Sequence, residues 1–289
     1  MIEYNPKLWT RIIFQFGRSD TMRQLLPAML GFGAYAAVIT FLESEVVHIH
    51  FKSTSIIHSL LGFVLSLLLV FRTNGSYDRW WEGRKLWGAL VNVSRNLQLK
   101  TIAIMGRQDR EAVVKMDEWI PLYAVSLKNH LRNKKTESHW LKAERHQPNQ
   151  VATLMFGEIN AWLRNGQITE IQYLTLNQDI NQFTDICGAC ERIKNTPIPY
   201  SYSSFIKKFI FIYMITMPFS FVEDFKYTLI PVLMFVFYAL GSLELLAEEI
   251  ENPFGNDDND LPLDALCQTI KKSVGELTET WSTGLSHGV

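Results

Sequence analysis

Two groups of side chains in this 289-residue sequence have types and spacings that could do chemistry. Cys187 and Cys190 form a Cys-x-x-Cys pair, a spacing found in redox and metal-binding thiols. No strand pattern precedes them, and their segment has helical periodicity, so we interpret them as packing cysteines. The acidic stretch 248–260 offers the oxygen ligands that calcium prefers, but its spacing does not fit an EF-hand loop. Phosphate loops, His-Glu-x-x-His pairs and nucleophile elbows are absent from the sequence, so we do not expect an enzyme.

A third pattern involves no titratable group. Ser55, Ser59, Phe63, Leu67 and Phe71 recur every four residues, so they would share one face of a helix, with the serines at its outer end. Such a stripe usually packs against neighbouring helices. Around a symmetry axis it would instead form stacked rings, and rings of Phe and Leu make a constriction that gates by dewetting. The spacing alone is compatible with both interpretations.

The elements that would carry this stripe are long apolar helices. Four runs contain no Asp, Glu, Lys or Arg: 25–42, 53–71, 209–222 and 227–243. Eighteen residues at ~1.5 Å each span about 27 Å, close to the thickness of a bilayer's hydrocarbon core. The third run is short and would begin upstream, near Ser203. We therefore predict an all-α membrane protein with four transmembrane helices; the alternative is a set of buried helices in a large soluble core.

Charge predicts the orientation and excludes one class of partner. Lys and Arg gather before the first run and after the second, whereas the short connections 43–52 and 223–226 are more acidic than basic. Positive residues stay on the cytoplasmic side, so both termini should be cytoplasmic in a multi-pass protein of the cell (inner) membrane. The net charge of −1 gives no basic surface for nucleic acid.

The chain accordingly divides into four predicted parts. Residues 1–74 hold the N-terminal segment and transmembrane helices 1 and 2, and 75–204 form a cytosolic helical region. Residues 205–246 hold helices 3 and 4, and 247–289 form a cytosolic acidic segment and helix. Within the cytosolic region, the second membrane helix is expected to continue past Gly75 to Trp87. Further helices are predicted around 119–131 and 168–190, with a loop over 133–149.

Two motifs resemble the signatures of the bestrophin family. The first is 71–74 (Phe-Arg-Thr-Asn) followed by 77–88 (Tyr-Asp-Arg-Trp-Trp-Glu-Gly-Arg-Lys-Leu-Trp-Gly), and the second is 252–255 (Asn-Pro-Phe-Gly) followed by an acidic run. Residues 190–193 (Cys-Glu-Arg-Ile) and 196–199 (Thr-Pro-Ile-Pro) resemble the compact bacterial branch. The resemblance covers almost the whole chain.

The resemblance implies a homopentameric ion channel in the lipid bilayer, with one pore on the fivefold axis. The family's neck consists of three apolar rings on the second membrane helix, which correspond here to Phe63, Leu67 and Phe71, after Gly62. A second constriction, the cytosolic aperture, corresponds to Ile171 or Gln172, depending on one gapped residue. A glutamine would make that ring wetter than the apolar side chain that is usual there.

Animal members of the family also bind calcium in a clasp that includes the acidic run. The matching positions are Glu249, Asn252, Asp257 and Asp260. This sequence departs from the animal pattern by placing asparagines at 256 and 259. We therefore predict no cofactor, with calcium at these four positions as the alternative.

The function that follows is passive conduction of small monovalent ions through an apolar neck. The acidic residues in the 43–52 connection and in 248–260 would concentrate cations, which favours sodium. The alternative is a chloride channel, as in animal bestrophins, and a further alternative is a membrane scaffold or sensor that conducts nothing. The sequence does not specify the gating stimulus, the physiological role or the choice between cation and anion.

Overall fold

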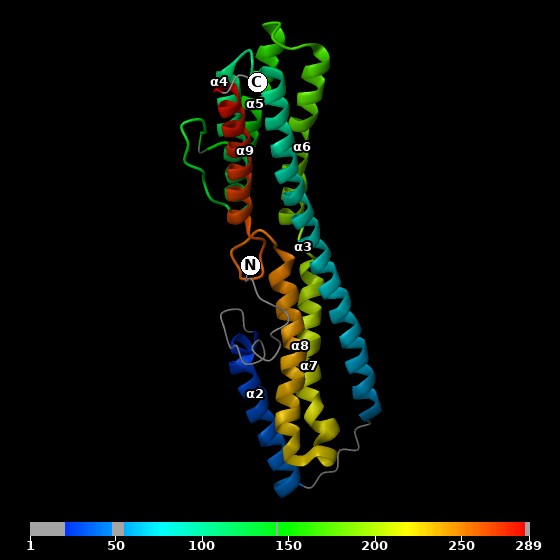
Figure 1. Cartoon of the computed structure of the whole chain (residues 1–289). Helices are drawn as coiled ribbons and strands as arrows, with labels where there is room; N and C mark the ends of the chain where they lie inside the picture. Colours follow the sequence, from blue (N-terminus) through cyan, green and yellow to red (C-terminus); the bar gives the residue numbers. More distant parts are fainter. Residues whose placement is uncertain (1–20, 48–54, 143, 287–289) are drawn as a thin grey trace. The chain divides into compact units, whose positions relative to one another are not determined.

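The computed structural model describes residues 21–47, 55–142 and 144–286, and these residues form helices and connections without a strand (Figure 1). The chain divides into two compact units. Unit 1 comprises Met1–Trp80, Pro197–Pro253 and Asp257–Asp260; unit 2 comprises Trp81–Thr196, Phe254–Asn256 and Leu261–Val289. The helices are α2 (Thr21–Phe41), α3 (Ser55–Met105), α4 (Arg110–Leu131), α5 (Gln147–Arg164), α6 (Glu170–Asn195), α7 (Tyr200–Phe225), α8 (Leu229–Glu251) and α9 (Leu263–Ser286), with a π-helical turn η1 (Leu42–Val47) and a 3-10 turn η2 (Lys226–Thr228).

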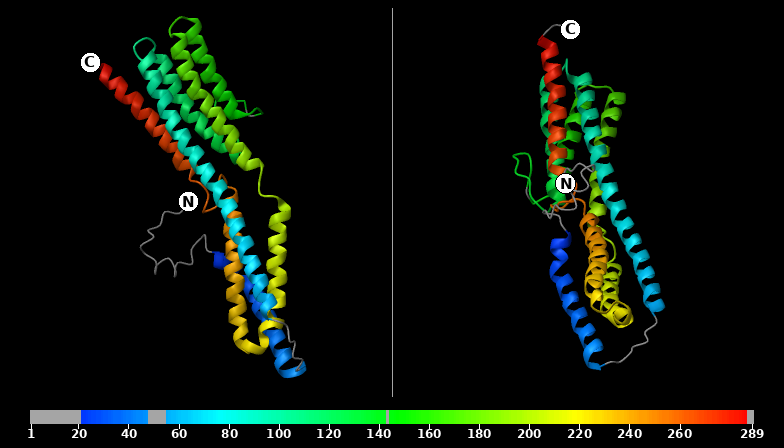
Figure 2. Two further views of the ribbon diagram at one scale, coloured as in Figure 1. Left: turned by 90° about the vertical axis from the view of Figure 1, so that its right-hand side faces the viewer. Right: turned by 60° about the horizontal axis from the view of Figure 1, so that its bottom comes forward.

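Unit 1 is built from the apolar helices that the uncharged runs predict. The helices α2, α7, α8 and the first part of α3 each contain one of the four runs. Their facing side chains form one core: Met29, Ala36, Leu65, Leu69, Ile206, Ile210, Met214, Met217, Leu233 and Phe237. Helices α7 and α8 run side by side as a hairpin (Figures 1 and 2), and the chain reverses between them at Lys226, whose φ of 45° is left-handed. Among the residues that the structure describes, three stretches are long and apolar enough to cross a membrane: Thr21–Glu45, Ile56–Met105 and Tyr200–Glu251, the last of which contains both α7 and α8.

Helix α3 contributes residues to both units. It was expected to continue past Gly75 to Trp87, and it runs without interruption to Met105 (Figure 1). Within unit 2 its Trp87, Leu90 and Leu97 are fully buried. One continuous helix therefore includes the apolar stripe at one end and core residues of unit 2 at the other.

Unit 2 is a helical bundle of α4, α5, α6, α9 and the second part of α3. The helix predicted around 119–131 is confirmed as part of α4. Its Trp119, Tyr123, Leu127 and Leu131, which recur every four residues, are all buried. The loop predicted for 133–149 was too long, and helix α5 was missed. Pro148 was interpreted as a loop residue, but it lies in the first turn of α5, where proline needs no amide hydrogen bond.

The helix predicted around 168–190 is α6, and its apolar residues are not all buried. Phe183, Ile186 and Cys190 are buried, whereas Ile171 and Leu174 are 77% and 64% exposed. The buried positions in the first half of α6 are Leu176, Asp179 and Ile180. The apolar residues at the start of α6 are therefore outside its packed face, which begins with Leu176.

The glycine that follows α3 occupies a place too tight for a side chain. A Cβ on Gly106 would lie 2.5 Å from the Ile102 carbonyl oxygen and 2.7 Å from the Trp281 Nε1. Gly106→Ala is expected to destabilise the protein by about 1–3 kcal/mol, because a backbone oxygen cannot move aside. The matched control is Gly157→Ala in α5, which has nothing within 4 Å. It should be neutral or stabilising by up to about 1 kcal/mol. Thermal unfolding of both variants in detergent measures the difference, and equal midpoints would contradict the steric account.

Asp264 should make unit 2 sensitive to acid. Hydrogen bonds from Lys128 and then from Arg132 lower the pKa of Asp264 from its ordinary 3.8 to about 2. A lowered pKa in the folded state means that the carboxylate stabilises the fold above pH 3.8 and loses this effect as the pH falls through 2. We expect Asp264→Asn to flatten the dependence of the unfolding midpoint on pH between these values. Glu276→Gln, an exposed acid of the same helix, is the control and should keep the wild-type slope.

Candidate functional site

An apolar stripe runs along the exposed side of α3 in unit 1. Phe63, Leu67 and Phe71, which we call the apolar stripe, are 66%, 45% and 60% exposed. On the opposite side of the same helix, Leu65 and Leu69 are fully buried in the core of unit 1. Large apolar side chains left exposed in register indicate a surface that another molecule, lipid or a pore axis covers. Of the two serines predicted at the outer end of the stripe, Ser59 is exposed, while the side chain of Ser55 is outside the described part.

Near the start of the stripe, the opposite face of α3 packs against α7. A Cβ on Gly62 would lie 2.7 Å from the Tyr213 hydroxyl of α7, so the absence of a side chain lets that ring approach. The Tyr213 ring stacks on His58, with ring centroids 4.1 Å apart and planes 21° from parallel. Contacts on this side hold the helix so that the three stripe residues face the other way.

The end of the stripe is followed directly by a buried charge. Arg72 is 1% exposed and its Nη2 donates to the Glu251 carboxylate of α8 at 2.6 Å, with Glu244 at 3.7 Å from its Nε. The other oxygen of Glu251 accepts from the backbone N–H of Ile198 at 2.8 Å. A buried arginine without an acidic partner would be strongly unfavourable, so this pair anchors α3 to α8.

Within unit 1 the first signature motif binds Glu251, which directly precedes the second motif, and Asn259 in the acidic run of that motif. Besides the Arg72 pair, Arg79 donates to the Glu251 carbonyl oxygen at 3.0 Å, and the Trp80 indole donates to the Asn259 carbonyl oxygen at 3.0 Å. Sequence reasoning treated the motifs as separate and missed this pairing. The signal in the sequence was Arg72, a charged residue directly after an uncharged run. Such a charge needs an acidic partner, but the sequence does not indicate which one.

The four positions considered for calcium lie in the same segment but do not converge as a set. Glu249 accepts a hydrogen bond from the Asn259 side-chain amide at 2.7 Å, and Asp260 accepts one from the Asp257 backbone N–H at 2.6 Å. Asn252 is exposed. Among the residues that the structure describes, the group of three His, Cys, Asp or Glu residues close enough to share a metal ion lies elsewhere, in unit 2. Asn259, where this sequence departs from the animal pattern, thus occupies one oxygen of the acidic group.

In unit 2, the two residues considered for the cytosolic aperture have different roles at the start of α6. Gln172 closes a capping box: its side-chain oxygen accepts from the Thr169 backbone N–H at 2.8 Å, and its own N–H donates to the Thr169 hydroxyl at 3.3 Å. The Ile171 side chain takes no part in the capping box and is 77% exposed. The apolar side chain is therefore available to a constriction, whereas the glutamine is engaged in the helix start.

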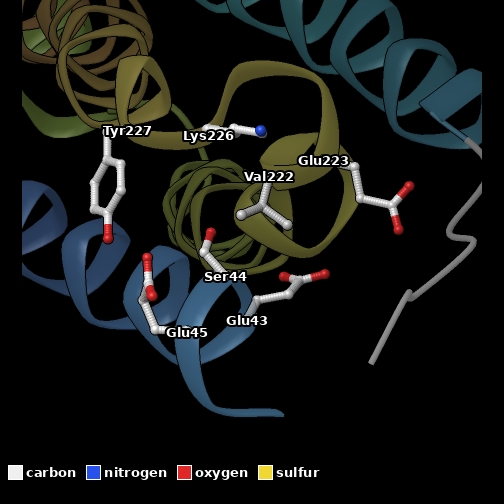
Figure 3. Close-up of a pocket in the computed structure, with 7 residues that line it drawn as sticks. All are labelled: Glu43, Ser44, Glu45, Val222, Glu223, Lys226 and Tyr227. Carbon is white, nitrogen blue, oxygen red and sulfur yellow. The ribbon is translucent and has the colours of Figure 1, made fainter. Parts of the chain in front are cut away.

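A polar pocket of about 490 Å³ lies where η1 meets the turn between α7 and α8. Its charged lining residues are Glu43, Glu45, Glu223 and Lys226. Figure 3 shows Glu43 and Glu45 coming from the α2 side, with the Tyr227 hydroxyl pointing toward the Glu45 carboxylate. Three carboxylates against one ammonium make this end of unit 1 a region of negative potential.

The Cys-x-x-Cys pair has the environment of packing thiols. Cys187 and Cys190 are free and buried on the inner face of α6. Burial, reinforced by the Glu191 carboxylate, raises the pKa of the Cys187 thiol to about 12, and burial likewise raises the pKa of Cys190. Thiols that stay protonated at neutral pH are poor nucleophiles and metal ligands, so this pair supports no redox chemistry.

The comparisons with known proteins agree with the motifs. A sequence model of the family described as Bacterial/Fungal Bestrophin protein matches residues 1–276. The chain is similar to the voltage-dependent anion channel-forming protein alr2987 of Nostoc sp., with 33% identity over 97% of this chain and 95% of the relative. It has the same identity to the voltage-dependent anion channel-forming protein YneE of Escherichia coli, over 94% and 92%. A crystal structure of a bacterial bestrophin homologue from Klebsiella pneumoniae superimposes with a TM-score of 0.80 at 28% identity, over 89% of this chain and 99% of that one. The chain therefore belongs to the bestrophin family, and it is a membrane protein of the ion-channel class, not an enzyme.

Proposed function

We propose that this protein conducts small monovalent anions such as chloride passively across the cell membrane, as a homopentamer with its pore on the symmetry axis. The observation that carries the anion choice is the description of its relatives, two of which are 33% identical over more than nine tenths of this chain and named anion channel-forming proteins. In this proposal α2, the first part of α3, α7 and α8 each cross the membrane. Both termini face the cytoplasm.

The apolar stripe forms the neck of the proposed pore. Phe63, Leu67 and Phe71 carry no charge, so a passing ion meets a dehydration barrier instead of a fixed counter-charge. Phenyl rings have electropositive edges and electronegative faces, and rings that present their edges to the axis favour anions. In a pentamer the stripes of five chains would face one another around the axis, so the apolar surface that is exposed in one chain would line the pore.

Ile171 forms the proposed second constriction, and its replacement gives a direct test. Ile171→Ala should change the single-channel conductance or the preference among anions of different size, because it removes volume from an exposed apolar ring. Gln172→Ala is the control on the adjacent position. It should weaken the start of α6 by about 0.5–1.5 kcal/mol through loss of the hydrogen bond between its side chain and the Thr169 N–H, and it should leave ion preference unchanged. The reverse pattern in single-channel recordings would assign the aperture to Gln172.

A second candidate is conduction of cations such as sodium, the preference expected from the sequence. One observation favours it: the pocket lined by Glu43, Glu45 and Glu223, with Lys226 as its single basic residue. If this pocket lies at the pore entrance, it would enrich cations there. The names of the relatives fit anions better, and for this reason anion conduction is the leading proposal.

The deciding experiment is a reversal-potential measurement on purified protein in planar bilayers under asymmetric sodium chloride. A reversal potential near the chloride equilibrium potential supports the anion proposal, and one near the sodium equilibrium potential replaces it by the second candidate. A variant with Glu43→Gln, Glu45→Gln and Glu223→Gln identifies the origin of the preference. Its reversal potential should stay unchanged if the neck selects anions and move toward chloride if the acidic pocket selects cations. Absence of current from correctly folded protein would favour the scaffold alternative.

A further inference from the structure

Two histidines and one glutamate converge in unit 2, where three helix ends meet. His130 lies in the last turn of α4, His146 is the N-cap of α5, and Glu191 lies near the end of α6. The Nε2 atoms of both histidines are 2.7 Å from the same Glu191 Oε1, and the two ring centroids are 4.3 Å apart. Among the residues that the structure describes, this is the one group of three His, Cys, Asp or Glu whose ligand atoms all lie within 4.8 Å of one another.

We propose that His130, His146 and Glu191 bind a divalent transition-metal ion of the zinc type. Two imidazole nitrogens and one carboxylate oxygen are a donor set that zinc uses, with water in the fourth position, whereas calcium and magnesium prefer oxygen alone. Ligand atoms about 2.1 Å from a tetrahedral ion are roughly 3.4 Å apart. The two 2.7 Å contacts therefore have to open by a fraction of an ångström, which side-chain rotation provides. Each of the three side chains is about 30% exposed, so an ion can reach them from solvent.

The surrounding charges leave the carboxylate accessible to an ion. The neighbouring cations on α6 bind elsewhere: Arg192 binds Glu82, and Lys194 donates to the His130 carbonyl and the Asn133 side chain. What Glu191 Oε1 contacts are the two imidazole Nε2 atoms. A metal ion would take the place of the protons that now lie between the imidazole Nε2 atoms and the carboxylate.

The hydrogen bond at the start of α5 opposes metal binding. The Nδ1 of His146 accepts from the Asn149 backbone N–H at 3.2 Å, so in the metal-free chain its Nε2 carries the proton. A metal on Nε2 would place a proton on Nδ1 and break this cap. Coordination thus competes with capping, and we expect a site of moderate affinity. Because His130 and His146 flank the connection between α4 and α5, a bound ion would tie that connection to α6.

The test uses full-length, tag-free protein that has been treated with chelator and then titrated with zinc chloride. Calorimetry should show one saturable site per chain, and cobalt as a spectroscopic substitute should give the visible absorption of a bound, low-coordinate ion. His146→Asn removes a ligand but retains a good N-cap, and Glu191→Gln retains an acceptor for both imidazoles. Each should weaken zinc binding at least about tenfold. His139→Gln is the matched control and should bind zinc as the wild type does, because His139 is an exposed histidine of the same connection whose ring lies against Trp140.

Two results would overturn the proposal: no saturable binding by the wild type, or equal affinity in wild type, His146→Asn and Glu191→Gln. Should both variants fail to fold, X-ray absorption of zinc-loaded wild type decides. Two imidazole ligands support the site, and a coordination shell without imidazole refutes it. Channel currents are not needed for any of these measurements, so the result is independent of ion selectivity.

Discussion

Replacing Phe63, Leu67 and Phe71 together by alanine should raise the current through the channel several-fold. All three side chains are exposed on one side of α3, and they are the widest groups of the proposed neck. Truncation removes volume and apolar surface from three consecutive rings, so water enters and the dehydration barrier to ions falls. Single-channel recording in planar bilayers measures the effect. Larger anions that the wild type excludes should also permeate the variant.

The control for this prediction comes from the same helix. Ile57, Leu61 and Val64 are also exposed and apolar, but at roughly 100° per residue they lie farther around α3 from the centre of the stripe. Their joint replacement by alanine should leave conductance near that of wild type. An unchanged current in the stripe variant, or an equal increase in the control, would refute the assignment of the neck.

Arg72→Met should cause the largest loss of stability of any single substitution considered. Its guanidinium is 1% exposed and binds Glu251 at 2.6 Å, with Glu244 nearby. Methionine keeps much of the side-chain volume but leaves the buried Glu244 carboxylate and the partly buried Glu251 carboxylate without their cation. Breaking a buried ion pair in this way costs about 3–5 kcal/mol. Unfolding by denaturant in detergent micelles should show this decrease, or the variant should fail to accumulate in the membrane.

Two further variants separate charge from packing at this site. Glu251→Gln added to Arg72→Met should recover part of the lost stability, because it removes one of the unpaired charges. Arg192→Gln breaks the exposed pair with Glu82, whose side chains are 66% and 43% exposed, and should cost no more than about 1 kcal/mol. Equal losses for Arg72→Met and Arg192→Gln would mean that burial does not determine the importance of the pair.

Local sequence patterns predicted the apolar helices and the stripe on α3. Uncharged runs of membrane-spanning length do not depend on what the helices touch, and four-residue spacing determines which residues share a helix face. The continuation of α3 past Gly75 followed from the same reasoning, because a lone glycine weakens a helix without ending it. Helix α5 was missed because Pro148 is compatible with a loop and with a first helical turn, and local sequence does not distinguish them.

Contacts between distant residues were decided by the tertiary structure alone. Arg72 binds Glu251 across 179 positions, and His130 and His146 meet Glu191 across 61 and 45. No spacing rule connects such residues, because their separation in space depends on how whole helices pack. The exposure of side chains at the start of α6 was also not predicted from the sequence. There the Ile171 side chain is exposed, and the Gln172 side chain is hydrogen-bonded in the capping box. Local sequence patterns thus predicted the long apolar helices. Packing determined which side chains remain accessible to ions, since burial is a property of neighbours that the chain brings together only when it folds.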